Sequence, residues 1–96
     1  MNGYQRKYLR GLAHNYKPQI IVGKNELTEG SLKSMMKCLD SNELIKVKFS
    51  DKDYMSSSKQ ILEEKLDCHI VGDIGKILIV YKKNCDKTQN NIVIPD

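Results

Sequence analysis

Basic side chains gather at the start of this chain, and their types and spacing suit the binding of an anion. Residues 1 to 25 carry five Lys and Arg residues and no acid, whereas residues 26 to 96 carry 11 bases against 12 acids. The positive excess behind the net charge of +4 therefore lies in the first quarter of the sequence. This asymmetry favours a polyanionic partner, with nucleic acid first and an anionic membrane surface second. The alternative is that a small domain carries surplus lysines for solubility.

A glycine-bearing turn at residues 23–26, which we call the glycine turn, predicts a phosphate contact. Before it, Ile20, Ile21 and Val22 form a β-branched run that is typical of a strand buried on both faces. After it, Thr28 is the expected N-cap of a helix, whose free N–H groups favour anions. We expect three residues of the turn to bring backbone N–H groups and one ammonium to a phosphate: Gly23, Lys24 and Asn25.

The first helix is expected from Gly3 to Asn15, with an apolar stripe on one side and bases on the others. The stripe follows the spacing of an amphipathic helix, through Tyr4, Tyr8, Leu9 and Leu12. The bases form either a solvated outer face or a phosphate-binding ridge, and the absence of acids favours the ridge. We predict a basic track for phosphates made of Arg6, Lys7, Arg10, His14 and Lys17.

Lysines further along the chain are candidates for flanking contacts. Residues 43–50 alternate between apolar and polar side chains, which predicts a strand with one apolar and one basic face. Lysines on that basic face either meet phosphates or are ordinary edge-strand charge. The flanking candidates are Lys46, Lys48, Lys76 and Lys82.

The elements that position these residues predict one α/β domain. Periodicity indicates two more helices and two more strands, over residues 29–39, 51–67, 69–73 and 76–82. Strands that alternate with helices favour a sandwich in which helices pack on a sheet of about four strands. The helix at 51–67 has a net charge of −2, so we expect it to lie away from a polyanion. Residues 83–96 form a polar tail, with either a short edge strand or a loose segment at 92–94.

The sequence contains no visible catalytic constellation. His14 and His69 each lack a spaced acid or nucleophile, and the neighbours Cys68 and His69 would point to opposite faces of a strand. The three cysteines lack metal-ligand spacing, so we expect reduced thiols in a cytosolic protein, with no metal and no cofactor. Gly72 and Gly75 match GxxG, but a hairpin turn explains both through access to positive φ. No apolar run is long enough to span a membrane.

Several separated motifs closely resemble the YhbY family, the stand-alone bacterial form of the CRM domain (chloroplast RNA splicing and ribosome maturation). The motifs are LRGLAHNYKPQIIVGKNELTEG, ELIKVK, an IGK-x-L-x-x-YK hairpin and a terminal I-x-I-P. The resemblance implies a fold like the C-terminal domain of bacterial translation initiation factor three, with a KH-like GxxG loop after the first strand. The glycine turn matches that loop, except that Glu26 replaces its second glycine. We expect this acid to shift the phosphate contact towards Lys24 and the first helix.

The resemblance also implies a function. Bacterial members of this family are associated with precursors of the large ribosomal subunit, and plant relatives use the domain in group II intron splicing. We therefore expect a cytoplasmic, monomeric, non-enzymatic protein that binds ribosomal RNA during large-subunit assembly and takes no small-molecule substrate. The alternative is a protein-interaction module that docks on a ribosomal protein or an assembly factor.

Overall fold

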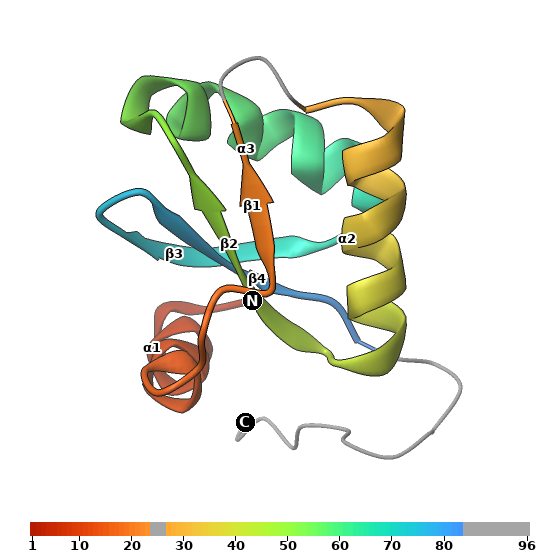
Figure 1. Ribbon diagram of the computed structural model, residues 1–96. Coiled ribbons are helices and arrows are strands. Elements are labelled where there is room, and N and C mark those ends of the chain that lie inside the picture. The colour runs from red at the N-terminus through yellow and green to blue at the C-terminus, as the bar shows by residue number, and fades with distance from the viewer. Residues whose placement is uncertain (24–26, 84–96) are drawn as a thin grey trace.

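The computed structural model describes residues 1–23 and 27–83 of the chain (Figure 1). Three helices and four strands follow one another in the predicted order, which confirms the α/β class. The predicted segment at 92–94 lies outside the described residues. The elements are α1 Gly3–Ala13, β1 Ile20–Val22, α2 Glu29–Ser41, β2 Leu44–Phe49, α3 Lys52–Leu66, β3 His69–Ile74 and β4 Ile77–Tyr81.

The four strands form one mixed sheet in the order β1-β2-β4-β3. β1 and β2 are parallel and are joined through α2, whereas the other two pairs are antiparallel. β4 lies inside the sheet, where its apolar side chains are covered. β2 also lies inside, between β1 and β4, so the interpretation of its lysines as edge-strand charge is wrong.

Each face of the sheet carries its own core (Figure 1). The larger core lies under α2 and α3, where the odd-numbered residues of β2, from Ile45 to Phe49, pack against Met35 and Leu62. The smaller core lies under α1 and consists of Leu9, Ala13, Leu44, Val71, Ile79 and Tyr81. The segment 51–67, which has a net charge of −2 because Asp51 and Asp67 flank α3, therefore lies across the sheet from the basic α1.

A capping box fixes where α2 begins, directly after the glycine turn. The Thr28 side chain accepts a hydrogen bond from Ser31 N at 3.3 Å, and Ser31 Oγ accepts one from Thr28 N at 2.8 Å. These contacts satisfy two of the N–H groups that a helix start leaves without partners. Thr28 is thus confirmed as the N-cap.

The predicted apolar stripe of α1 is confirmed at Leu9 and wrong at its other three positions. The helix buries Leu9 and Ala13, which are one turn apart, while Tyr4, Tyr8 and Leu12 stay exposed. Ala13 has a small side chain, which lets the helix end approach the sheet closely. The stripe counted tyrosines as core residues, but an amphipathic ring is readily accommodated at a surface.

The prediction that β1 is buried on both faces is also wrong. β1 is an edge strand, and only its Ile20 and Val22 side chains face the larger core. Ile21 points to the other face and is 74% exposed, because α1 does not extend over it. Within the described ranges, no helix combines the length and apolar character needed to cross a bilayer.

Candidate nucleic-acid interface

Four side chains form a row across one end of the sheet, on the face that carries α1. Strand register places Ile21 beside Lys48, Lys48 beside Ile77, and Ile77 beside Ile74. We call these four residues the open row. Lys46 and Ile79 lie one step along the same strands towards α1 and are buried, whereas Ile21, Lys48 and Ile74 are exposed. The helix thus covers one part of this face and leaves the open row accessible.

Arg10 lies against β3 beside the open row. Its Nη1 donates to the Val71 carbonyl at 3.1 Å, and a β-carbon on Gly72 would lie 2.6 Å from its Cδ. Gly72 is therefore required for close approach rather than for positive φ, which corrects the sequence interpretation. Only the second glycine of that pair, Gly75, has a positive φ, at 60°. Gly72 pairs with Ile79 and precedes Ile74 by two residues on the same face, so Arg10 adjoins the row.

The basic track of α1 lies on the side of the helix marked by Arg10. Arg6 is one turn earlier on that side, and Lys7 and His14 form the adjoining ridge. All four of these side chains are exposed, as is Lys17 in the connection to β1. The exposed Tyr4, Tyr8 and Leu12 lie on the opposite flank of the buried stripe. The helix thus separates a basic side from an aromatic side.

Two of the predicted flanking lysines, Lys46 and Lys82, donate hydrogen bonds to backbone carbonyls of the protein itself. Lys46 is 7% exposed, and its Nζ donates to the carbonyl oxygens of His14 at 3.3 Å and Tyr16 at 3.0 Å. Lys82 lies on the other face of the sheet, where its Nζ donates to the Leu66 carbonyl at 2.9 Å and contacts Met36 Sδ at 3.5 Å. Both ammonium groups already have protein partners, so we remove these two residues from the candidate interface.

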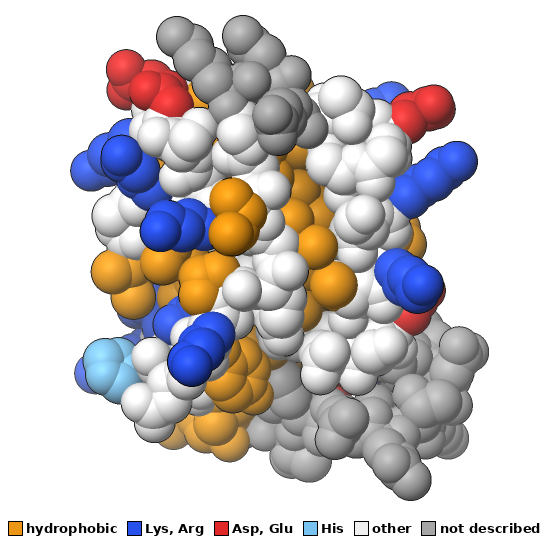
Figure 2. Space-filling model, viewed as in Figure 1, with side chains coloured by type: hydrophobic (Ala, Val, Ile, Leu, Met, Phe, Trp, Pro, Cys, Tyr) orange, Lys and Arg blue, Asp and Glu red, His pale blue; other side chains and the backbone are white. Residues whose placement is uncertain are grey.

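The other two flanking lysines lie at the same end of the sheet as the glycine turn. Lys48 is exposed in the open row, and Lys76 is exposed in the turn between β3 and β4. The Lys76 carbonyl accepts a hydrogen bond from Phe49 N at 2.8 Å, which ties this turn to the end of β2. In Figure 2, blue Lys and Arg side chains are interspersed with orange hydrophobic ones on the side of the molecule where α1 lies.

Hydrogen bonds anchor both stems of the glycine turn, the first at the end of β2 and the second on α3. Val22 O accepts from Ser50 N at 3.0 Å before the turn, and Leu27 N donates to the Tyr54 hydroxyl at 2.9 Å after it. Gly23 is half-buried at the end of β1, two residues after Ile21. Lys24 and Asn25, also predicted to meet phosphate, lie outside the described residues.

The described residues do not assemble a metal site or a nucleophile pair. No group of three or more His, Cys, Asp and Glu side chains among residues 1–23 and 27–83 is arranged to hold a metal ion. Cys68 is buried and its Sγ donates to the Leu62 carbonyl, whereas the exposed His69 stacks on Tyr81. Burial raises the pKa of the Cys68 thiol to about 11, which keeps it protonated and poorly reactive near neutral pH.

The raised pKa of Cys68 predicts a loss of stability in alkali. Above the ordinary pKa of 9.0 the unfolded chain releases this proton while the folded protein keeps it. The free energy of unfolding should therefore fall by up to ~3 kcal/mol as pH rises from about 9 to about 11. Urea titrations of the wild type and of Cys68→Ala across this range test the effect. The variant should lose less stability over the same range; an equal loss would contradict the assignment. Burial and the charge of Glu43 also raise the pKa of Tyr81, but this loss of stability is the same in the wild type and in Cys68→Ala.

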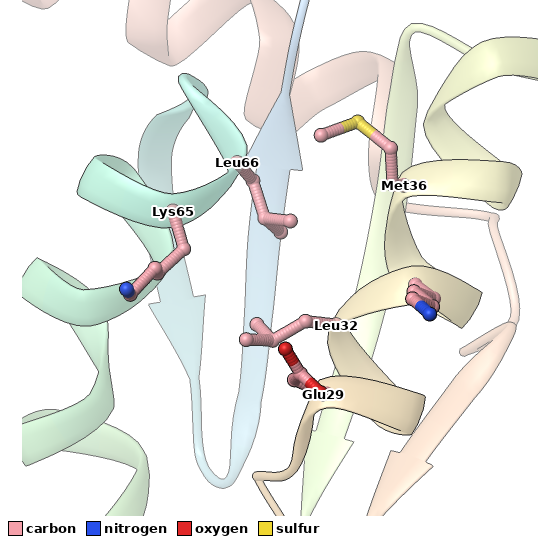
Figure 3. Close-up of a pocket in the computed structure, with 6 residues that line it drawn as sticks. Glu29, Leu32, Met36, Lys65 and Leu66 are labelled. Carbon is pink, nitrogen blue, oxygen red and sulfur yellow. The ribbon is translucent and has the colours of Figure 1, made fainter.

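A groove of about 290 Å³ lies between α2 and α3, across the sheet from α1 (Figure 3). Leu32, Met36 and Leu66 give it an apolar lining, and its charged side chains are Glu29, Lys33 and Lys65. It contains no histidine or cysteine, and its charges are mixed. The groove therefore offers apolar contact rather than chemistry, and it is separate from the basic track.

Comparison with known proteins decides the family. Residues 1–82 match the CRS1/YhbY (CRM) domain. The chain belongs to this family. Bacterial relatives are named for RNA binding: the chain is 37% identical over 82 residues to an RNA-binding protein of Haemophilus influenzae, covering 81% of each chain. It is 35% identical over 88 residues to a probable RNA-binding protein of Pseudomonas aeruginosa, covering 90% of this chain and 85% of the relative.

A solved structure supports both the fold and the family. The solution structure of a hypothetical protein of Staphylococcus aureus, described as a candidate RNA-binding protein, superposes on this CRM domain with a TM-score of 0.84. The two chains are 31% identical, and the match covers 99% of each. The family and its bacterial relatives are thus RNA-binding proteins.

Sequence reasoning missed the apolar part of this interface. Ile21 and Ile77 come from runs that looked like core strands, and Ile74 was expected in the hairpin turn rather than in β3. Nothing local to these residues indicates that α1 stops short. Gly72 did carry a signal, because a glycine inside a strand often marks a bulge or a close approach. The register shift between Ile70 and Gly72 and the packing of Arg10 show both.

Proposed function

We propose that this CRM domain binds RNA through the end of the sheet at which the open row, the glycine turn and the basic side of α1 meet. The observation that carries the proposal is the position of Arg10. It brings the side of the helix with Arg6 against β3 near Ile74, on the sheet face that also carries Lys48, so that bases far apart in sequence line one face. A cationic surface of this kind attracts the RNA backbone through its phosphates.

Among the described residues, the proposed phosphate contacts are those predicted basic residues whose side chains are exposed. The basic track and Lys48 provide the cations along the helix and the sheet, and Lys76 adds one at the hairpin. Gly23, which lies at the end of β1, is a proposed contact, and so are Lys24 and Asn25, which precede a helix start that favours anions in the sequence. Such contacts position the protein on RNA without reading its sequence.

The RNA is proposed to be ribosomal RNA of the large-subunit precursor, bound in the cytoplasm during assembly. This finer assignment is supported by the association of the YhbY family with that particle. Protein docking remains a second candidate function, and the α2–α3 groove favours it because it offers an apolar lining. The groove and the basic surface lie on different faces, so the two functions are compatible.

Equilibrium binding across a salt series tests the main proposal. The purified protein is titrated with a structured fragment of large-subunit ribosomal RNA and, as a control, with duplex DNA of the same charge. We expect tighter binding to the RNA and a linear fall of log K with log salt, with a slope of about −4. Weak binding with no preference for the RNA would contradict the proposal and direct the search to protein partners.

A further inference from the structure

The open row is apolar at three of its four positions and is nevertheless accessible. Ile21 is 74% exposed and Ile74 is 54% exposed, and register makes them part of one line with Ile77. Neighbouring strands lie ~4.8 Å apart, so the line extends for roughly 14 Å across the sheet. Ile74 and Ile77 are direct neighbours, and Lys48 separates them from Ile21. Exposed apolar side chains that gather around a cation in one line indicate a binding site rather than scattered surface residues.

A planar cation is held in place beside this row. Arg10 uses one of its five N–H donors on the Val71 carbonyl and rests where a side chain at position 72 would lie. Its side chain remains exposed, so other donors stay available. Because Gly72 precedes Ile74 by two residues on one face of β3, the guanidinium adjoins the apolar line.

We propose that the open row and the Arg10 guanidinium form a platform for unpaired RNA bases. The proposal rests on the RNA-binding function above and specifies which part of the RNA the sheet contacts. Bases in loops and bulges expose flat faces that pack on apolar side chains and stack on guanidinium planes. Bases in a duplex are covered by their neighbours and cannot use an isoleucine surface. RNA duplexes would therefore be held by the cations alone.

The surrounding charge favours RNA over an apolar protein segment as the occupant. Lys48 lies in the middle of the row, with Arg10 at one border and Lys76 in the adjoining turn. The row itself contains no acid. The nearby Asp73 points to the other face, where it pairs with Lys59 at 2.6 Å. An apolar base with a phosphate on either side matches this arrangement of isoleucines and cations.

The test compares single-stranded and duplex RNA that carry the same number of phosphates. The double variant Ile21→Ser/Ile74→Ser removes exposed apolar surface and no charge. We expect it to bind the single strand roughly five- to tenfold more weakly, with an unchanged salt slope and unchanged duplex binding. Ile61→Ser is the matched control, because Ile61 is 44% exposed on α3, across the sheet.

A second variant tests the placement of Arg10. Gly72→Ala would displace its side chain, whereas Gly11→Ala meets no atom within 4 Å and serves as the control. Gly72 is a positioning residue in this proposal, so Gly72→Ala should weaken single-strand binding more than duplex binding. Wild-type affinity in both Gly72→Ala and the isoleucine double variant would overturn the platform.

The outcomes separate this inference from the proposed function. If the wild type binds RNA with a steep salt slope but shows no preference for the single strand, the platform is wrong and the phosphate surface stands. If the wild type binds neither form, the proposed function fails and the platform fails with it. A single-strand preference that disappears in the isoleucine variant supports both.

Discussion

Replacing Lys46 with methionine is expected to lower the free energy of unfolding by about 2 to 4 kcal/mol. Methionine keeps the apolar stem but removes the ammonium that donates to the His14 and Tyr16 carbonyls. These carbonyls lie at the end of α1, where the helix dipole is negative and a cation is favourable. Without the ammonium, two acceptors beside a buried side chain lose their partner. The melting temperature should fall by roughly 10 °C or more.

Lys48→Met is the matched control for this change. Lys48 is two residues further along β2 on the same face, but its side chain is exposed. Its replacement should alter stability by less than about 0.5 kcal/mol. The two variants should differ in the opposite sense in RNA binding. Folded Lys46→Met should keep the wild-type salt slope, whereas the magnitude of the slope should fall by about one in Lys48→Met. Equal stability of the two variants would mean that the Lys46 ammonium does not hold α1.

Reversing three charges on the proposed interface is expected to have the largest effect on RNA affinity. The variant Arg6→Glu/Lys7→Glu/Lys48→Glu places acids where phosphates would bind, on exposed side chains of α1 and β2. At low salt, we expect the affinity for the ribosomal RNA fragment to fall ~100-fold or more. The salt slope should fall by about three, one for each cation removed.

A second triple reversal separates a surface effect from a net-charge effect. Lys33→Glu/Lys37→Glu/Lys65→Glu changes the net charge equally, on exposed residues of α2 and α3 across the sheet. Long-range repulsion is screened beyond roughly 10 Å at ~0.1 M salt, so this control should keep most of the affinity. If both triple variants lose affinity alike, binding follows overall charge and the proposed interface is wrong. Circular dichroism of both variants checks that they are folded.

The order of the elements was predictable from the sequence because the signals are local. Thr28 caps α2 through its own side chain, and Gly75 takes a positive φ in the hairpin turn. The apolar and polar alternation of β2 likewise identifies its core face, from Ile45 to Phe49. Such features depend on neighbours within a few residues, so a single sequence contains what is needed to find them.

The composition of the interface was less predictable because it depends on where α1 ends over the sheet. Lys46 and Lys48 are equivalent in the pattern of β2, yet one lies under the end of α1 and the other beyond it. Ile21 is exposed for the same reason, although its neighbours Ile20 and Val22 pack on the larger core. The residues of β1 and β2 do not by themselves indicate how far α1 extends over the sheet.

The unequal size of the two cores has a consequence for motion. α1 contributes only Leu9 and Ala13 to its core, whereas α2 and α3 rest on the larger one. Local unfolding should therefore release α1 before the rest of the sheet opens. Since α1 carries most of the basic track, detachment would dismantle the proposed binding surface while leaving the body of the fold intact. A ligand that bridges helix and sheet would oppose this opening by mass action, so the bound nucleic acid would itself complete the fold of the region that recognises it.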